Sequence, residues 1–151
     1  MSKTFTDLTT EGKKFFQQLK QLENLEIAVG FQRGIQSDDG VDVVDYAAFN
    51  ELGTSNIPAR PFMQQSFENH EPELFKACEK LNTALSQGHS CELSLNELGV
   101  FLKSLIQREI TEGDFEPNSE LTILLKGSDT PLIDSNLMRE SVNYVIRKEG
   151  G

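Results

Sequence analysis

Residues 25–31, which read Leu-Glu-Ile-Ala-Val-Gly-Phe, decide the fold class of this chain. The large apolar side chains stand at positions 25, 27, 29 and 31, and glutamate, alanine and glycine stand between them. Successive side chains of a strand point to opposite faces of a sheet. The alternation therefore predicts a strand with one buried face.

A second alternating stretch lies near the other end of the chain, where Val142, Tyr144 and Ile146 take every other position. Between the two stretches the apolar residues recur at helical spacing instead. A strand near each end with helices between them predicts an α+β fold. We expect a small, mostly antiparallel sheet, formed by these strands and packed against three or more helices.

The expected helices follow from this spacing and from capping signals. They cover residues 8–22 (capped by Thr9 or Thr10), 45–52, 61–87 and 94–106, with short helical turns over 119–127 and around 137–138. Residues 32–40 read as a loop, and residues 41–44 as a short extra strand. Cys78 lies on an apolar helical stripe, so we expect it in the core.

Glycine, proline and polar residues set the expected boundaries. Gly53 is expected to end a helix in the left-handed conformation, and Pro61 to be the first residue of the next helix. Pro72 is expected to kink or restart that helix. Ser94 and Glu97 have the spacing of a capping box for the helix that follows.

Size and charge limit the classes of function. The 151 residues suffice for a single domain covering residues 1–151. Fourteen Lys and Arg stand against 24 Asp and Glu, a formal net charge of −10. Such a chain repels a phosphate backbone, so we expect no specific nucleic-acid binding. An acidic surface would suit a passive conduit for DNA, because repulsion prevents sticking.

Compartment and cofactors are constrained by what the sequence lacks. The polar residues 1–7 do not resemble a leader, and no apolar run is long enough to span a membrane. The two cysteines are too few for a disulfide scaffold. His89 and Cys91, with Cys78 further back in the chain, lack the paired spacing of a zinc site. Asp38, Asp39 and Asp42 lack a calcium-loop pattern and read as a solvated acidic loop.

No catalytic arrangement stands out in the sequence. There is no Gly-x-Ser-x-Gly elbow, no dinucleotide fingerprint and no phosphate-binding loop. His70 reads most simply as a surface histidine. We therefore expect a protein that is not an enzyme and that uses neither a cofactor nor a metal.

Two segments contain residues that local secondary structure does not explain. The first reads Tyr-Ala-Ala-Phe-Asn-Glu-Leu-Gly-Thr over 46–54 and Ile-Pro-Ala-Arg-Pro-Phe-Met over 57–63. The second carries Lys-Gly-Ser at 126–128 and Pro-Leu-Ile-Asp at 131–134, followed by Leu137. A helix stop and a turn explain most of the first segment, and a loop explains the second. Neither explains Arg60 between two prolines or Phe62 directly after them.

Together, in this order, the segments resemble the tail-component family of long-tailed bacteriophages and prophages, whose members are called neck, tail-completion or minor tail proteins. That family carries a Tyr-Ala-x-x-x-Glu-Phe-Gly-Thr stretch, then Pro-Ala-Arg-Pro-Phe, and later Lys-Gly-Ser and Pro-Leu-Ile-Asp-Thr-Gly-x-Leu. This chain departs at Leu52, where phenylalanine is usual, and at Ser135 and Asn136, where Thr-Gly is usual. The first swap is apolar for apolar, and the second keeps a hydroxyl and a residue tolerant of left-handed backbone.

The resemblance implies a structural virion protein that is assembled in the bacterial cytoplasm and acts in tail completion or head–tail joining. It implies a ring of copies of this chain, in contact with tail-tube and head–tail connector proteins, with a passive channel for DNA and no membrane. The residues expected to contact a subunit or partner are Gly53, Thr54, Pro58, Arg60, Pro61, Phe62, Lys126 and Asp134.

Residue chemistry suggests how this contact would work. The prolines of residues 54–61 would reduce the entropy lost on docking. Arg60 would grip a carboxylate of a neighbour with two hydrogen bonds. Phe62 would fill a pocket, either in its own core or in the adjacent subunit, and the acidic residues 36–45 would face the channel or solvent.

Two other classes of function stay open. One is a cytoplasmic adaptor or regulatory protein without catalytic activity, which would have a stable partner outside any phage. The other is a hydrolase with a site near His70 or His89, which replacement of both histidines would test.

Overall fold

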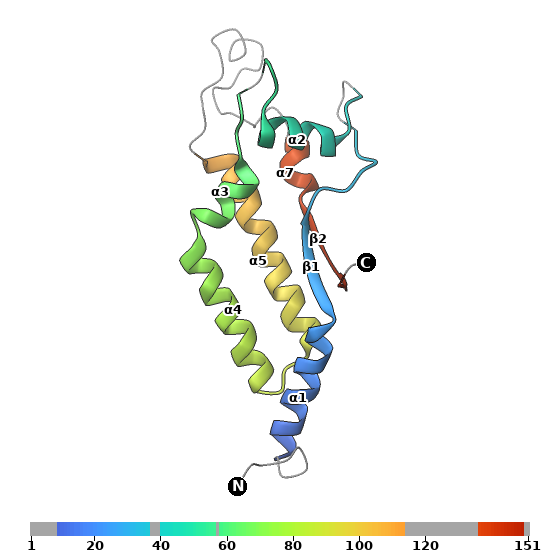
Figure 1. Ribbon diagram of the computed structural model, residues 1–151, viewed down its shortest axis with the longest axis vertical. Coiled ribbons are helices and arrows are strands. Elements are labelled where there is room, and N and C mark those ends of the chain that lie inside the picture. The colour runs from blue at the N-terminus through green and yellow to red at the C-terminus, as the bar shows by residue number, and fades with distance from the viewer. Residues whose placement is uncertain (1–8, 37–39, 57, 114–135, 150–151) are drawn as a thin grey trace. The chain divides into compact units, whose positions relative to one another are not determined.

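The computed structural model describes residues 9–36, 40–56, 58–113 and 136–149. Its elements are α1 (Thr10–Glu23), β1 (Leu25–Gly30), α2 (Val43–Leu52), α3 (Phe62–Glu68), α4 (Glu71–Ser86), α5 (Cys91–Glu112), α7 (Asn136–Ser141) and β2 (Asn143–Lys148) (Figure 1). β1 and β2 pair in an antiparallel two-stranded sheet, and helices pack against it. The predicted α+β class, with strands from near both ends of the chain, is confirmed.

The chain divides into two compact units. The first comprises Met1–Ala28, Pro72–Leu102 and Tyr144–Gly151, and the second comprises Val29–Glu71 and Lys103–Asn143. That residues 1–151 form a single domain stays a prediction. The expected turns over 119–127, as well as Lys126, Asp134, Asp38 and Asp39, lie outside the described residues.

In the first unit, α1 begins and ends where its capping residues predict. The Thr9 hydroxyl accepts a hydrogen bond from the Gly12 amide at 3.0 Å, and Asn24 ends the helix directly before β1. Across the sheet, Arg147 Nε donates to Glu26 Oε1 at 2.7 Å. The exposed and half-buried residues of β2 alternate as predicted, whereas all six residues of β1 are half-buried.

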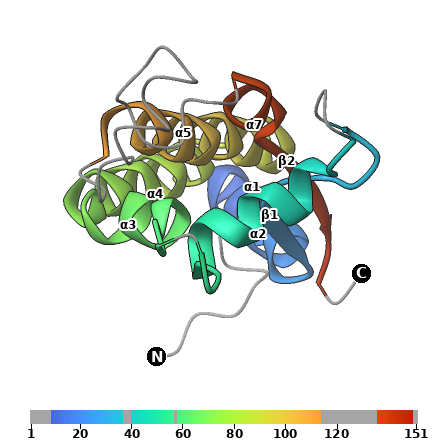
Figure 2. The same cartoon turned by 90° about the horizontal axis from the view of Figure 1, so that it is seen from above.

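The core of the first unit lies between α1, the sheet and the hairpin that α4 makes with α5, whose helices lie side by side (Figures 1 and 2). Its buried residues are Leu85, Cys91 and Leu95. Burial raises the pKa of the Cys91 thiol. Tyr144 of β2 packs against Gly99, where an added Cβ would collide with the ring, and its hydroxyl donates to Asn96 Oδ1 at 2.9 Å.

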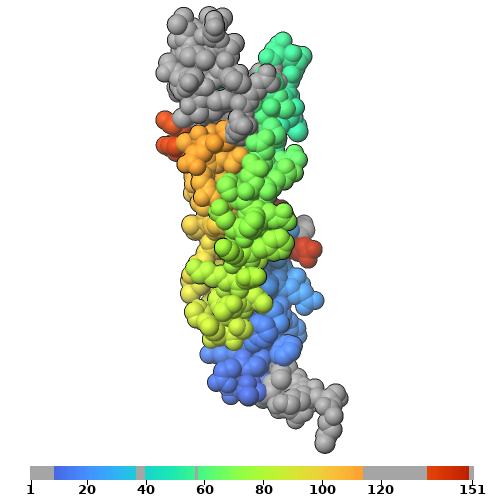
Figure 3. Space-filling model, turned by 90° about the vertical axis from the view of Figure 1, so that its left-hand side faces the viewer, coloured from blue at the N-terminus to red at the C-terminus, as the bar shows by residue number. Residues whose placement is uncertain are grey.

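Two predictions for the first unit are wrong. α5 begins at Cys91, a turn before the expected capping box, because Ser90 Oγ accepts from the Leu93 amide and Gln18 of α1 accepts from the Cys91 amide at 2.8 Å. Ser94 is therefore buried within the helix. Cys78 is exposed, since the outer face of α4 is uncovered (Figure 3).

The core of the second unit joins α2, α3, the second half of α5 and α7. It consists of Val43, Ala47, Phe62, Ile106, Ile110, Met138 and Val142. Gln107 of α5 donates to the Arg139 carbonyl at 3.1 Å, and Arg139 donates to Thr111 Oγ1 at 3.3 Å. These contacts fasten α7 to α5.

The expected strand over 41–44 is wrong. Asp42 makes an isolated bridge with Gln36 and then caps α2, its carboxylate accepting from the Val44 and Gly34 amides at 2.9 Å each. These two hydrogen bonds, the Gly34 one first, lower the pKa of the Asp42 carboxyl. A single polar residue at the cap thus starts the helix two residues earlier than the apolar pattern suggests.

The predicted position of Pro72 at a helix start is correct, whereas the predicted position of Pro61 is wrong by one residue. Pro72 is the second residue of α4, so the helix restarts there as predicted. Pro61 is the residue before α3, with ψ at 67°, and Phe62 is the first helical residue.

No helix in the described part of the chain is long and apolar enough to cross a bilayer.

Candidate partner-binding site

The candidate site starts at the end of α2, where Gly53 redirects the chain. Gly53 has φ 76° and ψ 168°, and its amide donates to the Phe49 carbonyl at 2.9 Å. The positive φ is as predicted, but ψ lies far from the left-handed helical region. This combination is accessible to glycine almost alone, and it sends the chain away from the helix in an extended direction.

In the second unit, residues 51–59 are named here the 51–59 loop. They comprise the last two residues of α2 and the connection toward α3, in which residue 57 lies outside the described residues. The Arg60 amide donates to the Asn50 carbonyl at 2.6 Å, which brings the two ends of the loop together. Asn50 is itself buried and donates from its side chain to the Tyr46 carbonyl at 2.9 Å. A surface loop with adjoining ends is the geometry of an Ω-loop, a class often used in recognition.

The Glu51 side chain makes a second link across the loop, which the sequence patterns did not predict. Its Oε2 accepts from the Met63 amide at 2.8 Å, and its Oε1 accepts from the Gln64 amide at 3.1 Å. These amides lie in the first turn of α3, where a helix has no backbone partner for its own N–H groups. A carboxylate there is also favoured by the helix dipole.

The far end of the loop is buried in its own chain. Phe62 is completely buried and meets the Phe31 ring edge-on, with centroids 5.9 Å apart. Phe62 therefore fills a pocket in its own core, the first of the two expected alternatives. Arg60 is only 8% exposed, so its guanidinium also lies inside this chain. A grip by Arg60 on a neighbouring subunit stays a prediction.

The middle of the loop is exposed and uncharged. Thr54 Oγ1 accepts from the Asn56 amide at 3.2 Å, which makes a tight turn just after Gly53. The exposed residues are Thr54, Ser55, Asn56, Pro58 and Ala59. They offer two hydroxyls, an amide and small apolar groups to a partner, but no charge.

The last turn of α2 exposes Leu52 (78%), which belongs to the 51–59 loop, and Phe49 (44%), which lies one turn before it. These two residues are three apart and therefore share one helix face. Large apolar side chains that are exposed next to one another are typical of a protein-binding surface.

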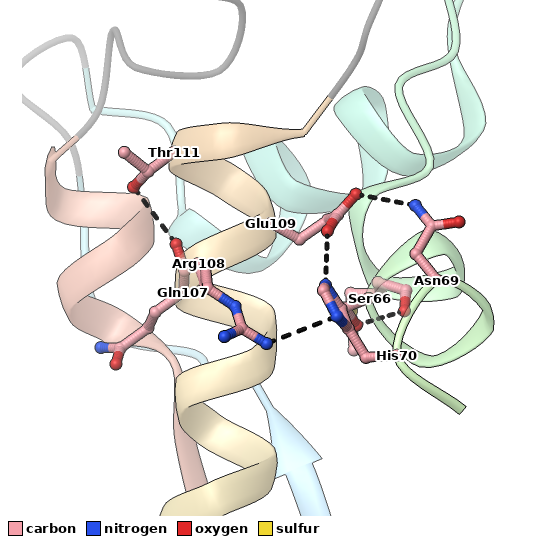
Figure 4. Close-up of polar contacts among 8 residues, drawn as sticks. Ser66, Asn69, His70, Gln107, Arg108, Glu109 and Thr111 are labelled. Carbon is pink, nitrogen blue, oxygen red and sulfur yellow. Dashed lines mark hydrogen bonds and ion pairs between the residues drawn. The ribbon is translucent and has the colours of Figure 1, made fainter. Parts of the chain in front are cut away.

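A second polar arrangement in this unit surrounds Glu109 of α5 (Figure 4). Glu109 is 5% exposed, and its carboxylate accepts from Asn69 Nδ2 at 3.2 Å and lies 3.3 Å from His70 Nε2. Arg108 approaches the other ring nitrogen, Nδ1, at 3.4 Å. His70, predicted as a surface histidine, is half-buried, with 21% of its side chain exposed.

The contacts of His70 define its role. Its Nε2 faces the Glu109 carboxylate, and its Nδ1 faces the Arg108 guanidinium. Both ring nitrogens are thus engaged with neighbours. The arrangement fastens the corner between α3 and α4 to α5, and no cluster of three His, Cys, Asp or Glu side chains suited to a metal ion occurs among the described residues.

Comparisons of the chain with known protein families, with curated proteins and with solved structures gave no match. The resemblance to phage tail components accordingly rests on the residues quoted above. Of the eight predicted contact residues, the six between Gly53 and Phe62 lie in or next to the 51–59 loop. Lys126 and Asp134 are outside the described residues.

Proposed function

We propose that this chain is a structural virion protein of a tailed phage or prophage, which acts in tail completion or head–tail joining by assembling, as a ring, at the interface of tail and neck. Its motif residues support the family, and the 51–59 loop supports docking as the way in which it acts. The proposed partners are further copies of the chain and the tail-tube and connector proteins.

The observation that carries the proposal is the contrast within the loop. Its ends are fixed by the Asn50–Arg60 hydrogen bond and by burial of Phe62, while residues 54–56, 58 and 59 are exposed. A loop whose ends are already fixed loses less conformational entropy on binding, and Pro58 restricts it further. Such a loop is suited to recognition of another protein.

Charge adds a second line of support. The chain carries a formal net charge of −10, whereas the exposed loop residues and the apolar pair Phe49 and Leu52 carry none. Contacts between acidic subunits are least opposed where the touching surfaces are uncharged. An acidic protein also leaves DNA free to pass, because it repels the phosphates.

The test is electron microscopy of an induced lysate from a strain that lacks the gene, beside the same strain carrying the gene on a plasmid. Full heads next to separate, finished tails would support action at the joining step. Heads with aberrant or overlong tails would support tail completion. Normal infectious particles from the deletion strain would overturn the virion function and favour a cytoplasmic adaptor.

A further inference from the structure

Glu51 lies in the last turn of α2, two residues before Gly53. It is the first residue of the loop, and its carboxylate crosses the loop to the two amides of Met63 and Gln64. Both carboxylate oxygens are used, at 2.8 and 3.1 Å. The contact therefore spans the same gap as the backbone hydrogen bond between Arg60 and Asn50.

We propose that Glu51 is the positioning residue of this site: its carboxylate holds the 51–59 loop in the shape that binds the partner. The inference rests on the proposed docking function. Charged acceptors make stronger hydrogen bonds to backbone amides than neutral ones do. The two contacts fix the direction in which the chain enters α3, and with it the exposed residues 54–56, 58 and 59.

Glu51 acts on the loop more than on the core. Its side chain is partly open to solvent. Phe62 holds the start of α3 in the core by its complete burial, and its amide donates to the Arg60 carbonyl at 2.8 Å. Loss of the Glu51 carboxylate should thus loosen the loop while the unit stays folded.

The decisive experiment compares Glu51→Ala and Glu51→Gln with the wild-type chain by amide hydrogen exchange of Met63 and Gln64. In Glu51→Ala, exchange at both amides should accelerate by roughly tenfold or more, while amides in the middle of α5 keep their protection. Glu51→Gln should be intermediate, since an amide side chain offers one acceptor oxygen in place of two.

Asp42→Ala is the matched control. Asp42 is also a carboxylate that accepts from two backbone amides, those of Gly34 and Val44, but it caps the other end of α2. The control removes the same charge and the same kind of contact without touching the 51–59 loop.

Each variant is then expressed in the deletion strain and the yield of joined, infectious particles is counted. We expect Glu51→Ala to lower the yield at least fivefold, Glu51→Gln to restore part of it, and Asp42→Ala to match the wild type. Unchanged exchange at Met63 and Gln64 would overturn the inference, and so would an equal loss of particles in Asp42→Ala. Normal particles from the deletion strain itself would instead overturn the proposed function.

Discussion

Two glutamates of the second unit hold polypeptide in place by different means. Glu51 is partly open to solvent and binds two backbone amides across a loop, whereas Glu109 is buried and binds the side chains of Asn69 and His70. Water can replace the partners of Glu51 but has little access to Glu109. The carboxylate of Glu51 therefore shapes the surface near it. The packing of helices around the buried carboxylate of Glu109 instead depends on its partners Asn69 and His70.

The largest loss of stability in this unit is expected at Phe62, the buried residue that follows the 51–59 loop. Phe62→Ala removes a fully buried ring that contacts Phe31, so the free energy of unfolding should fall by about 3–5 kcal/mol. Urea denaturation followed by circular dichroism measures this. A loss below about 1 kcal/mol would mean that Phe62 is not held in its own core.

His70→Ala tests the buried site. It leaves the Glu109 carboxylate in the interior with Asn69 as its remaining side-chain partner, and should lower the free energy of unfolding by about 2–3 kcal/mol.

The double variant His70→Ala/Glu109→Ala serves as the control. It should be less destabilised than the sum of the two single variants, because no charge is then left buried without a partner. Additive losses would show that Glu109 and His70 do not act as a pair.

Asp42 offers a pH test of a partly exposed carboxylate. Its pKa is lowered in the folded chain by the amides of Gly34 and Val44, so its stabilising effect should be present above the ordinary value of 3.8 and be lost as the pH falls through the lowered folded value. The difference in unfolding free energy between wild type and Asp42→Ala should accordingly shrink in acid. A difference that is the same at about pH 6 and about pH 2.5 would contradict the role of the carboxylate.

Leu52→Ser should have the smallest effect on the isolated chain. Leu52 is 78% exposed, so the free energy of unfolding should stay within about 0.5 kcal/mol of the wild type. If the apolar pair with Phe49 belongs to the docking surface, particle yield should nevertheless fall by roughly fivefold or more. The combination of normal stability and normal yield would exclude Leu52 from that surface.

Local patterns predicted most of the elements correctly. The helical spacing over residues 8–22 predicted α1, the cap was predicted at Thr9 or Thr10 and lies at Thr9, and the alternation around Tyr144 predicted β2. These signals depend on neighbours within one or two turns, which the sequence displays directly. The start of α5 was misplaced because Gln18, 73 residues away from Cys91 along the chain, supplies an acceptor there.

The candidate site was predictable in part. The composition of residues 53–62 alone singles out the segment, and its prolines, Gly53 and Phe62 lie where a loop changes direction and enters the core. The depth at which Arg60 and Phe62 lie was not predictable, since burial depends on which elements cover a side chain.

The sequence by itself determined the α+β class, the capped α1, the alternation of β2 and the position of the distinctive loop, because each depends on short-range periodicity or on the backbone limits of glycine and proline. Only the tertiary structure decided that Glu51 caps α3, that His70 pairs with buried Glu109, and that Cys78 remains exposed. Those contacts join residues far apart in the chain, and their partners are selected by packing, which no local pattern encodes.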